Sequence, residues 1–295
     1  MFKIENTQTY TQKIIYDLEF SGDLRKDNGI NCCIWQIAAK DQETGQTFCT
    51  VVNPYKRNHN VPEPVDDRYK MPTEEELYYT GAPDIVEAMY NFRGFLDTCL
   101  KSSNKKAICL ISHNGFRSDK VIFENALIRY DMMNIFNGIH IYFFDTLYYF
   151  RKIYPGLSSY SLANLYMYKF NKLIEDAHDA TVDVVKLEEL LCTEKRLKGS
   201  IYPLYSIPFT NVSGVGSFTE NMIGAYGYIS VDHLLSSFMN HKQNIILFLQ
   251  STILADRATL LTKRFLDFII NESNQRIPTL LKQQQALKQT MIEES

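Results

Sequence analysis

The chain has 295 residues, of which 45% are hydrophobic and 22% are charged, and its formal net charge is −3. This length suits one large domain plus an accessory domain, or two domains, and the composition is that of an ordinary globular protein. None of the six cysteines forms a C-x-x-C pair, which argues against zinc sites. The N-terminus has no apolar signal region and no stretch approaches the length of a membrane span. We therefore expect a soluble intracellular protein, cytoplasmic or nuclear, that does not contact a membrane.

The first part of the chain predicts an antiparallel meander. Apolar runs rich in β-branched and aromatic residues predict strands near 12–20, 32–40 and 46–53. The turns between them are short, and strands joined by short turns pair antiparallel. The polar stretch 54–80 contains four prolines and predicts a long loop.

The second part of the chain alternates helices with strands, which favours parallel pairing. The expected elements are strands at 105–112 and 139–144 and helices at 84–100, 118–130, 145–152, 159–168 and 177–193. The fold class is therefore α/β, with a mixed five-stranded sheet flanked by helices.

The last third of the chain predicts an all-α region. We expect a first domain over 1–193, a linker over 194–205 and a helical accessory region over 206–295. The helices of this region are expected near 217–224, 231–239, 242–255, 257–271 and 277–291.

Two carboxylates, Asp17 and Glu19, lie two residues apart where the first strand ends. Alternation along a strand sends both side chains to one face, with Leu18 on the other. Solvated strand ends often carry such pairs. A pair of divalent cations would also relieve the repulsion between the two acids.

A second polar group follows the strand at 105–112. Asn114 and Gly115 suit a turn, and Asp119 then begins a helix, where an acid is favoured by the helix dipole and by capping. Asp145 closes the next strand, and we expect it to cap the helix that follows it. Each of these residues has an ordinary structural explanation when it is taken alone.

A third group places His178 and Asp183 on one helix, five positions apart, with the small Ala180 between them. An exposed helix face would explain His178. Asp183 is flanked by valines and Leu187, which suggests a helix side turned towards the core.

These acids and the histidine suit hydrolysis of a phosphodiester. Four carboxylates can hold two Mg²⁺ ions, which activate a water and stabilise the leaving oxygen. A nearby histidine can take the proton of that water because its pKa lies near neutrality. All-oxygen ligands favour Mg²⁺ or Mn²⁺ over zinc.

In this order D-x-E, H-N-G-x-R-x-D, Y-S-L and H-x-A-x-x-D resemble the motifs of the DEDDh exonucleases, relatives of the DnaQ proofreading subunit on a ribonuclease H-like fold. The resemblance covers residues 10–193, and HNGFRSD at 113–119 and SYSLANLY at 159–166 resemble the three-prime repair (TREX-type) members. It implies a ribonuclease H-like sheet and a 3′→5′ exonuclease that releases nucleoside 5′-monophosphates from single-stranded or frayed DNA ends. It also implies a site with two Mg²⁺ ions, for which Mn²⁺ substitutes.

The resemblance assigns roles to individual residues. It implies metal ligation by Asp17, Glu19, Asp119 and Asp183, with His178 as the general base. It also implies contacts to the substrate from six further residues: Leu18, Phe20, Ser21, Asn114, Arg117 and Tyr160. Phe20 departs from the family pattern, which has threonine there, and this departure affects contacts to the terminal nucleotide more than catalysis.

The segment NVSGVGSFTENMIG followed by YISVDHLL resembles a helix-hairpin-helix motif. Glycines of this motif let backbone N–H groups approach phosphate oxygens at a helix N-terminus. The resemblance implies contacts to the DNA backbone from Ser213, Gly214, Gly216 and Ser217. A glycine turn before a packed helix is the ordinary alternative, and few Lys or Arg residues lie nearby.

Two other functions stay open. One is a 3′→5′ exoribonuclease on the same fold. The other is a nucleic-acid-binding adaptor without catalysis, whose working surface is the C-terminal helices. The full set of four acids and one histidine favours an enzyme over the adaptor.

Overall fold

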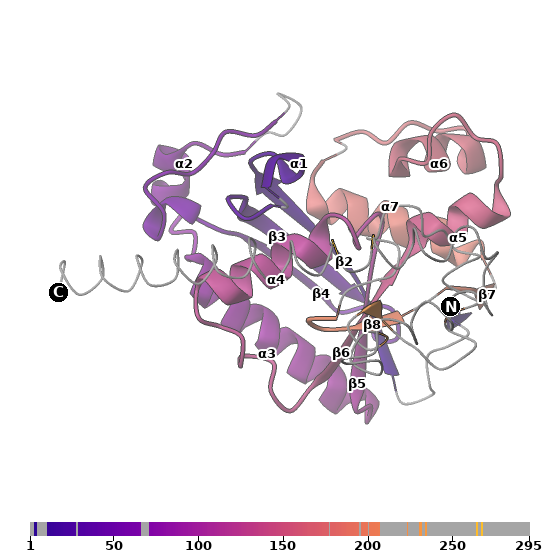
Figure 1. Cartoon of the computed structure of the whole chain (residues 1–295), viewed down its shortest axis with the longest axis horizontal. Coiled ribbons are helices and arrows are strands. Elements are labelled where there is room, and N and C mark those ends of the chain that lie inside the picture. The colour runs from indigo at the N-terminus through magenta and orange to yellow at the C-terminus, as the bar shows by residue number, and fades with distance from the viewer. Residues whose placement is uncertain are drawn as a thin grey trace.

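The computed structural model has a mixed six-stranded sheet with helices on both faces (Figure 1). It describes residues 3–4, 11–27, 29–65, 71–176, 178–194, 196–199 and 201–206, together with Ile223, Ser230, Val231, Leu234, Arg264 and Asp267. The predicted α/β class and mixed sheet are confirmed. None of the helices in this described part is long and apolar enough to cross a bilayer.

The predicted meander is present. Strand β2 (Thr11–Ser21) pairs antiparallel with β3 (Cys33–Asp41), which pairs antiparallel with β4 (Thr47–Val51). On the other side, β2 pairs parallel with β5 (Ala107–Ser112) and β5 with β6 (His140–Asp145).

One strand exceeds the predicted five. The segment expected to be a linker contains β8 (Ile201–Pro203), which pairs antiparallel with β6 and completes the order β4-β3-β2-β5-β6-β8. The same segment contains β7 (Arg196–Leu197), which pairs parallel with β1 (Lys3–Ile4). Both strands are too short to show the hydrophobic alternation of a strand, which explains why the sequence does not predict them.

Helices cover the two faces of the sheet in two groups, as Figure 1 shows. One face packs against α3 (Ile85–Ser103) and α4 (Asp119–Arg129). The other packs against α5 (Thr146–Ile153), α6 (Leu162–Phe170) and α7 (Ala180–Cys192). Alternation along β2 divides its side chains between the two cores, with Ile14, Tyr16 and Leu18 facing the first and Ile15 facing the second.

The stretch 54–80, predicted to be a loop, contains two helical segments. A 3₁₀ turn, η1, spans Pro54–Lys56, and α2 spans Glu74–Tyr79. A capping box explains α2, because Thr73 accepts from the backbone of Glu76 while the Glu76 carboxylate accepts from the backbone of Thr73. A four-residue helix, α1 (Leu24–Asp27), follows β2.

Ile223, Val231 and Leu234, which follow residue 206, are buried in the core that includes α3 and α4. The remaining positions of the predicted C-terminal helices lie outside the described residues. Ser213, Gly214, Gly216 and Ser217 of the expected hairpin also lie outside them.

Candidate metal centre

The candidate metal centre lies where strand β2 has a neighbouring strand on one side only. Strand β5 pairs with β2 only as far as Ile15, whereas β3 follows β2 to Ser21. Beyond Ile15, one edge of β2 therefore has no neighbouring strand. Asp17 and Glu19 lie in this stretch on the face covered by α7, and Glu19 is buried with 4% of its surface exposed.

Asp119 occupies the open edge of β2. Its Oδ1 accepts from the Leu18 backbone N–H at 3.0 Å, and its Oδ2 accepts from the Ser118 hydroxyl at 2.7 Å. The residue is buried and is the first residue of α4, where the expected favourable helix dipole acts on it. Its carboxylate is thereby fixed beside the two acids of β2.

His178 lies outside the helix on which it was predicted. Helix α7 begins at Ala180, Asp179 is its N-cap, and His178 precedes the cap with a φ of 74°. The prediction was wrong because the Asp179 side chain accepts from the backbone N–H groups of Thr181 and Val182. Asp179 is therefore the N-cap, and the helix begins only after it. Asp183 lies in the first turn of α7, as expected for a side facing the sheet.

Glu19, His178 and Asp183 converge. One ligand atom of each lies within 4.8 Å of the ligand atoms of the other two. The strand, the preceding turn and the helix thus present two carboxylates and one imidazole to one point. The two carboxylates at this spacing fit a divalent cation, and the imidazole lies beside them.

The pKa of each of the four carboxylates is raised, in every case by burial first. The pKa of Asp17 is raised well above its ordinary value, by burial first and then by the charges of Asp119 and Glu19. Burial followed by Asp183 and Asp119 raises the pKa of Glu19 to about 9. Burial also raises the pKa of Asp119, and raises that of Asp183 to about 6. Bound cations would offset the cost of ionising these buried acids and the repulsion between Asp17, Glu19 and Asp183, so the four acids fit a metal centre.

Asp145 holds the loop that leads to Asp119. As expected it caps α5, accepting from the Leu147 N–H at 2.9 Å. Its carboxylate also accepts from the N–H groups of Asn114 at 2.8 Å and Phe116 at 3.0 Å. Burial raises the pKa of Asp145 to about 7. This carboxylate therefore holds a loop in place and does not belong to the group of four acids.

The turn at 113–118 requires glycine at its centre. A Cβ on Gly115 would lie 1.8 Å from Ser112 Oγ, so only glycine lets the chain pass the end of β5. Asn114 has a φ of 65°, and both Asn114 and Arg117 are exposed. The turn thus presents two polar side chains at the surface and directs Asp119 inward.

The other expected substrate contacts have varied environments. Leu18 and Phe20 pack into the core on the α3 side, away from the carboxylate face of β2. Ser21 is fully buried, and its hydroxyl has no hydrogen-bond partner among the described residues. The Tyr160 hydroxyl donates to the Tyr154 carbonyl at 2.6 Å and so closes the loop before α6. The roles of these residues in substrate binding stay predictions.

Sequence reasoning missed two residues that support the centre. Gln36 of β3 binds the N-terminus of α7, and Asp179 caps it. A cap residue before an apolar periodic run was the available signal for Asp179. Gln36 has no such signal, because its partners are 143 and 144 positions away in the chain.

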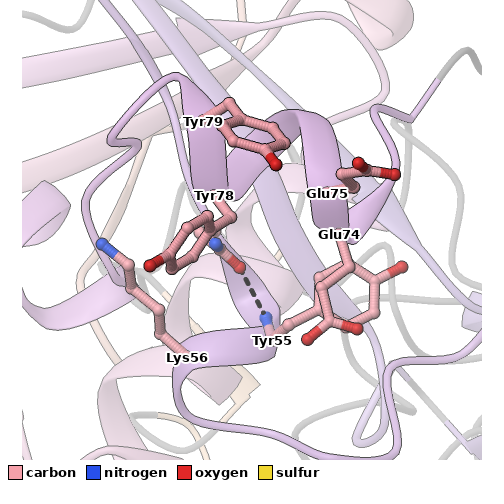
Figure 2. Close-up of a pocket in the computed structure, with 7 residues that line it drawn as sticks. Tyr55, Lys56, Glu74, Glu75, Tyr78 and Tyr79 are labelled. Atoms are coloured by element: carbon pink, nitrogen blue, oxygen red, sulfur yellow. Dashed lines mark hydrogen bonds between the residues drawn. The ribbon is translucent and has the colours of Figure 1, made fainter.

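A pocket of about 460 Å³ lies at a different place, between η1 and α2 (Figure 2). Its lining consists of Asn53, Tyr55, Lys56, Glu74, Glu75, Tyr78 and Tyr79. The Lys56 ammonium donates to the Ala82 carbonyl at 2.7 Å. None of the predicted site residues lines this pocket, so the carboxylate centre and the pocket are separate features.

A family model identifies an exonuclease domain in this chain. The family model described as Exonuclease (RNase_T) matches residues 14–191. No curated protein matches. Among solved structures, the zinc-bound E. coli ExoI–ssDNA complex is 17% identical with a TM-score of 0.44, and the match covers 63% of this chain and 40% of that one. E. coli exonuclease I with a dA16 oligonucleotide is 18% identical with a TM-score of 0.46, and the match covers 62% of this chain and 41% of that one. The chain thus spans about two fifths of the length of these proteins.

Proposed function

The chain belongs to the exonuclease family that the RNase_T model describes, and from this premise we propose that it is a metal-dependent 3′→5′ exonuclease. It hydrolyses the terminal phosphodiester bond of DNA and releases nucleoside 5′-monophosphates. The observation that carries this proposal is the convergence of Glu19, His178 and Asp183, with Asp17 and Asp119 beside them.

Asp17, Glu19, Asp119 and Asp183 would hold two Mg²⁺ ions, for which Mn²⁺ substitutes. When bound, such ions supply a more acidic water and stabilise the leaving oxygen. The His178 imidazole takes the proton of the attacking water as general base. The positive φ of His178 keeps its side chain off the helix and directed towards Glu19 and Asp183.

The remaining predicted residues act on the substrate strand. Arg117 and Asn114 are exposed beside the turn that delivers Asp119, where they can bind phosphate oxygens of the strand. Leu18 and Phe20 pack into the core on the α3 side, so we propose that they contact the terminal nucleotide only at the open edge of β2. Phe20 replaces the threonine of the family pattern. Single-stranded or frayed 3′ ends are the favoured substrates, because a terminal bond must leave the base-paired duplex to enter the site.

DNA is favoured over RNA because HNGFRSD and SYSLANLY resemble the TREX-type enzymes. The alternative is an exoribonuclease that uses the same centre. An adaptor without catalysis is a poorer fit, because it has no use for buried acids that repel one another.

The test is a product assay with single-stranded DNA and RNA of one sequence, labelled at either end, in Mg²⁺ and in EDTA. The proposal expects the 5′-labelled DNA to shorten stepwise and the 3′ label to leave at once as a mononucleotide, only with the metal. Faster hydrolysis of RNA would replace the DNA assignment by the exoribonuclease. Nucleic-acid binding without any hydrolysis in Mg²⁺ or Mn²⁺ would favour the adaptor function over both nucleases.

A further inference from the structure

Gln36 lies directly opposite Glu19 in the sheet. The register pairs Glu19 of β2 with Gln36 of β3, and side chains of directly paired residues point to the same face. Gln36 is buried, with 6% of its surface exposed. Its carboxamide therefore lies on the face that α7 covers, next to the centre.

The carboxamide binds the first residues of α7 through both of its polar atoms. Its oxygen accepts from the Ala180 N–H at 3.0 Å, and its nitrogen donates to Asp179 Oδ1 at 3.4 Å. The same Oδ1 accepts from the N–H groups of Thr181 at 2.8 Å and Val182 at 3.4 Å. Gln36 and Asp179 together satisfy the first three N–H groups of the helix, which have no partners within it.

The bound turn is the one that carries His178. A left-handed backbone is unfavourable at a residue other than glycine, so this conformation of His178 needs support from its surroundings. His178 lies one position before Asp179, and Asp183 lies four positions after it. Two hydrogen bonds from one side chain of β3 therefore fix the point from which both residues extend.

A second glutamine binds α7 far from this turn. Gln42 Nε2 donates to Glu188 Oε1 at 3.1 Å, and Lys40 pairs with the same carboxylate at 2.5 Å. These contacts hold the middle of α7 against the end of β3. Gln42 thus offers the same side chain on the same helix without contact to the His178 turn.

We infer that Gln36 is a positioning residue of the centre, which places His178 and Asp183 against Glu19 by clamping the turn at 178–180. This inference rests on the proposed nuclease function. The clamp needs an uncharged side chain that both accepts and donates. A glutamate at position 36 keeps the acceptor for Ala180, but it turns a carboxylate towards Asp179 and repels it.

The test is therefore a double-mutant cycle. Gln36→Glu should lower kcat by about 10- to 100-fold with little change in KM, since small displacements of catalytic groups cost that much. Asp179→Asn in this background supplies a donor to the new carboxylate, and an asparagine caps a helix as well as an aspartate. The double variant should recover most of kcat, and Asp179→Asn alone should stay near wild type.

Gln42→Glu is the matched control and should leave kcat within about twofold. The inference fails if Gln36→Glu behaves like this control, or if the double variant stays as slow as Gln36→Glu. Should Gln36→Glu not fold, Gln36→Leu against Gln42→Leu decides, because both remove hydrogen bonds without adding charge. Equal kcat in these two variants overturns the clamp.

A readout without turnover separates this inference from the proposed function. The imidazole ¹³C–¹H resonances of His178 report its surroundings by NMR in the full chain. They should move in Gln36→Glu, return in the double variant and stay in place in Gln42→Glu. If the variants show this pattern but the wild-type protein has no nuclease activity, the proposed function is wrong and the positioning role of Gln36 stands. If the wild-type protein is an active nuclease but the His178 resonances do not move in Gln36→Glu, only the inference about Gln36 is wrong.

Discussion

Two regions of the molecule hold several carboxylates each, and these carboxylates differ in their spacing along the sequence, their burial and the direction of their pKa shifts. Glu74, Glu75 and Glu76 are consecutive in the chain and exposed at the start of α2. The acids of the metal centre come from β2, α4 and α7, far apart in sequence, and Glu19 and Asp119 are buried. Hydrogen bonds from Thr73 lower the pKa of Glu76, whereas burial and neighbouring acids raise the pKa of Asp17 and Glu19.

The difference shows that density of acids along the sequence does not indicate a metal site. The α2 acids have a complete structural explanation in the helix dipole and the capping box, and water screens their charges. The acids of the centre lie where ionisation is costly, because burial raises the pKa of all four and neighbouring acids add to the shift for Asp17, Glu19 and Asp183. A bound cation would offset this cost.

The largest expected effect is the loss of activity in Asp17→Asn. Removing a ligand forfeits several kcal/mol of transition-state stabilisation, so turnover should fall by roughly 10³-fold. Single-turnover kinetics on 5′-labelled DNA measure it. Glu74→Gln with Glu75→Gln is the control and should keep full activity.

Asp17→Asn should also fold at least as stably as wild type in EDTA, because an amide removes repulsion from the cluster. A variant that loses activity only by unfolding, or a control that loses activity equally, contradicts the contrast between the two regions.

The next effect is the response of the metal-free protein to pH. The pKa of Glu19 is 4.5 ordinarily and about 9 in the folded protein. The folded state thus binds this proton more tightly than the unfolded state, so protonation favours folding. The free energy of unfolding in EDTA should fall as pH rises from about 4.5 to about 9, with Asp183 adding to the fall below about 6.

Urea unfolding in EDTA at a series of pH values measures this slope. Mn²⁺ should flatten it, and so should Glu19→Gln. Glu75→Gln on α2 should leave it as it is. If the free energy of unfolding of the wild-type protein is constant from about pH 4.5 to about pH 9, the acids of the centre do not destabilise the folded state.

A smaller effect is expected in the loop that delivers Asp119. Gly115→Ala places a methyl group 1.8 Å from Ser112 Oγ, and overpacking of this kind costs about 1–3 kcal/mol. Gly94→Ala on α3 is the control, since no atom lies within 4 Å of its added Cβ and alanine favours a helix. Urea unfolding should show the first variant destabilised and the second slightly stabilised. The reverse order would mean that the turn tolerates a side chain.

The smallest effect belongs to α2. Thr73→Ala removes the cap, which costs about 1 kcal/mol. Nuclease activity should not change, because the centre makes no use of α2. Chemical denaturation and the product assay check the two halves of this prediction. A loss of activity beyond the loss of folded protein would connect α2 to the centre.

The sequence predicted the sheet well because its strands carry local signals. Apolar runs rich in β-branched and aromatic residues and short turns sufficed for the meander, and alternating helices and strands sufficed for the parallel half. Helix α2 was missed because its signal is a single capping box in a proline-rich stretch. Strand β8 was missed because three residues show no period.

The convergence of the centre was anticipated from motif order, while its exact construction was not. His178 was placed on α7, because a sequence does not display which of two neighbouring polar residues becomes the cap. The role of Gln36 was not predicted, since its hydrogen bonds to α7 join residues more than a hundred positions apart. Contacts of that range depend on tertiary packing and leave no local pattern.

The most direct test of the central claim is a calorimetric titration of the protein with Mn²⁺ near neutral pH. The centre predicts binding that is lost in Asp17→Asn with Glu19→Gln and is unchanged in Glu74→Gln with Glu75→Gln. Binding should also release protons, since the pKa of Glu19 lies above neutrality before the cation enters. Mn²⁺ binding that survives loss of Asp17 and Glu19, or that disappears with the α2 acids, would contradict it.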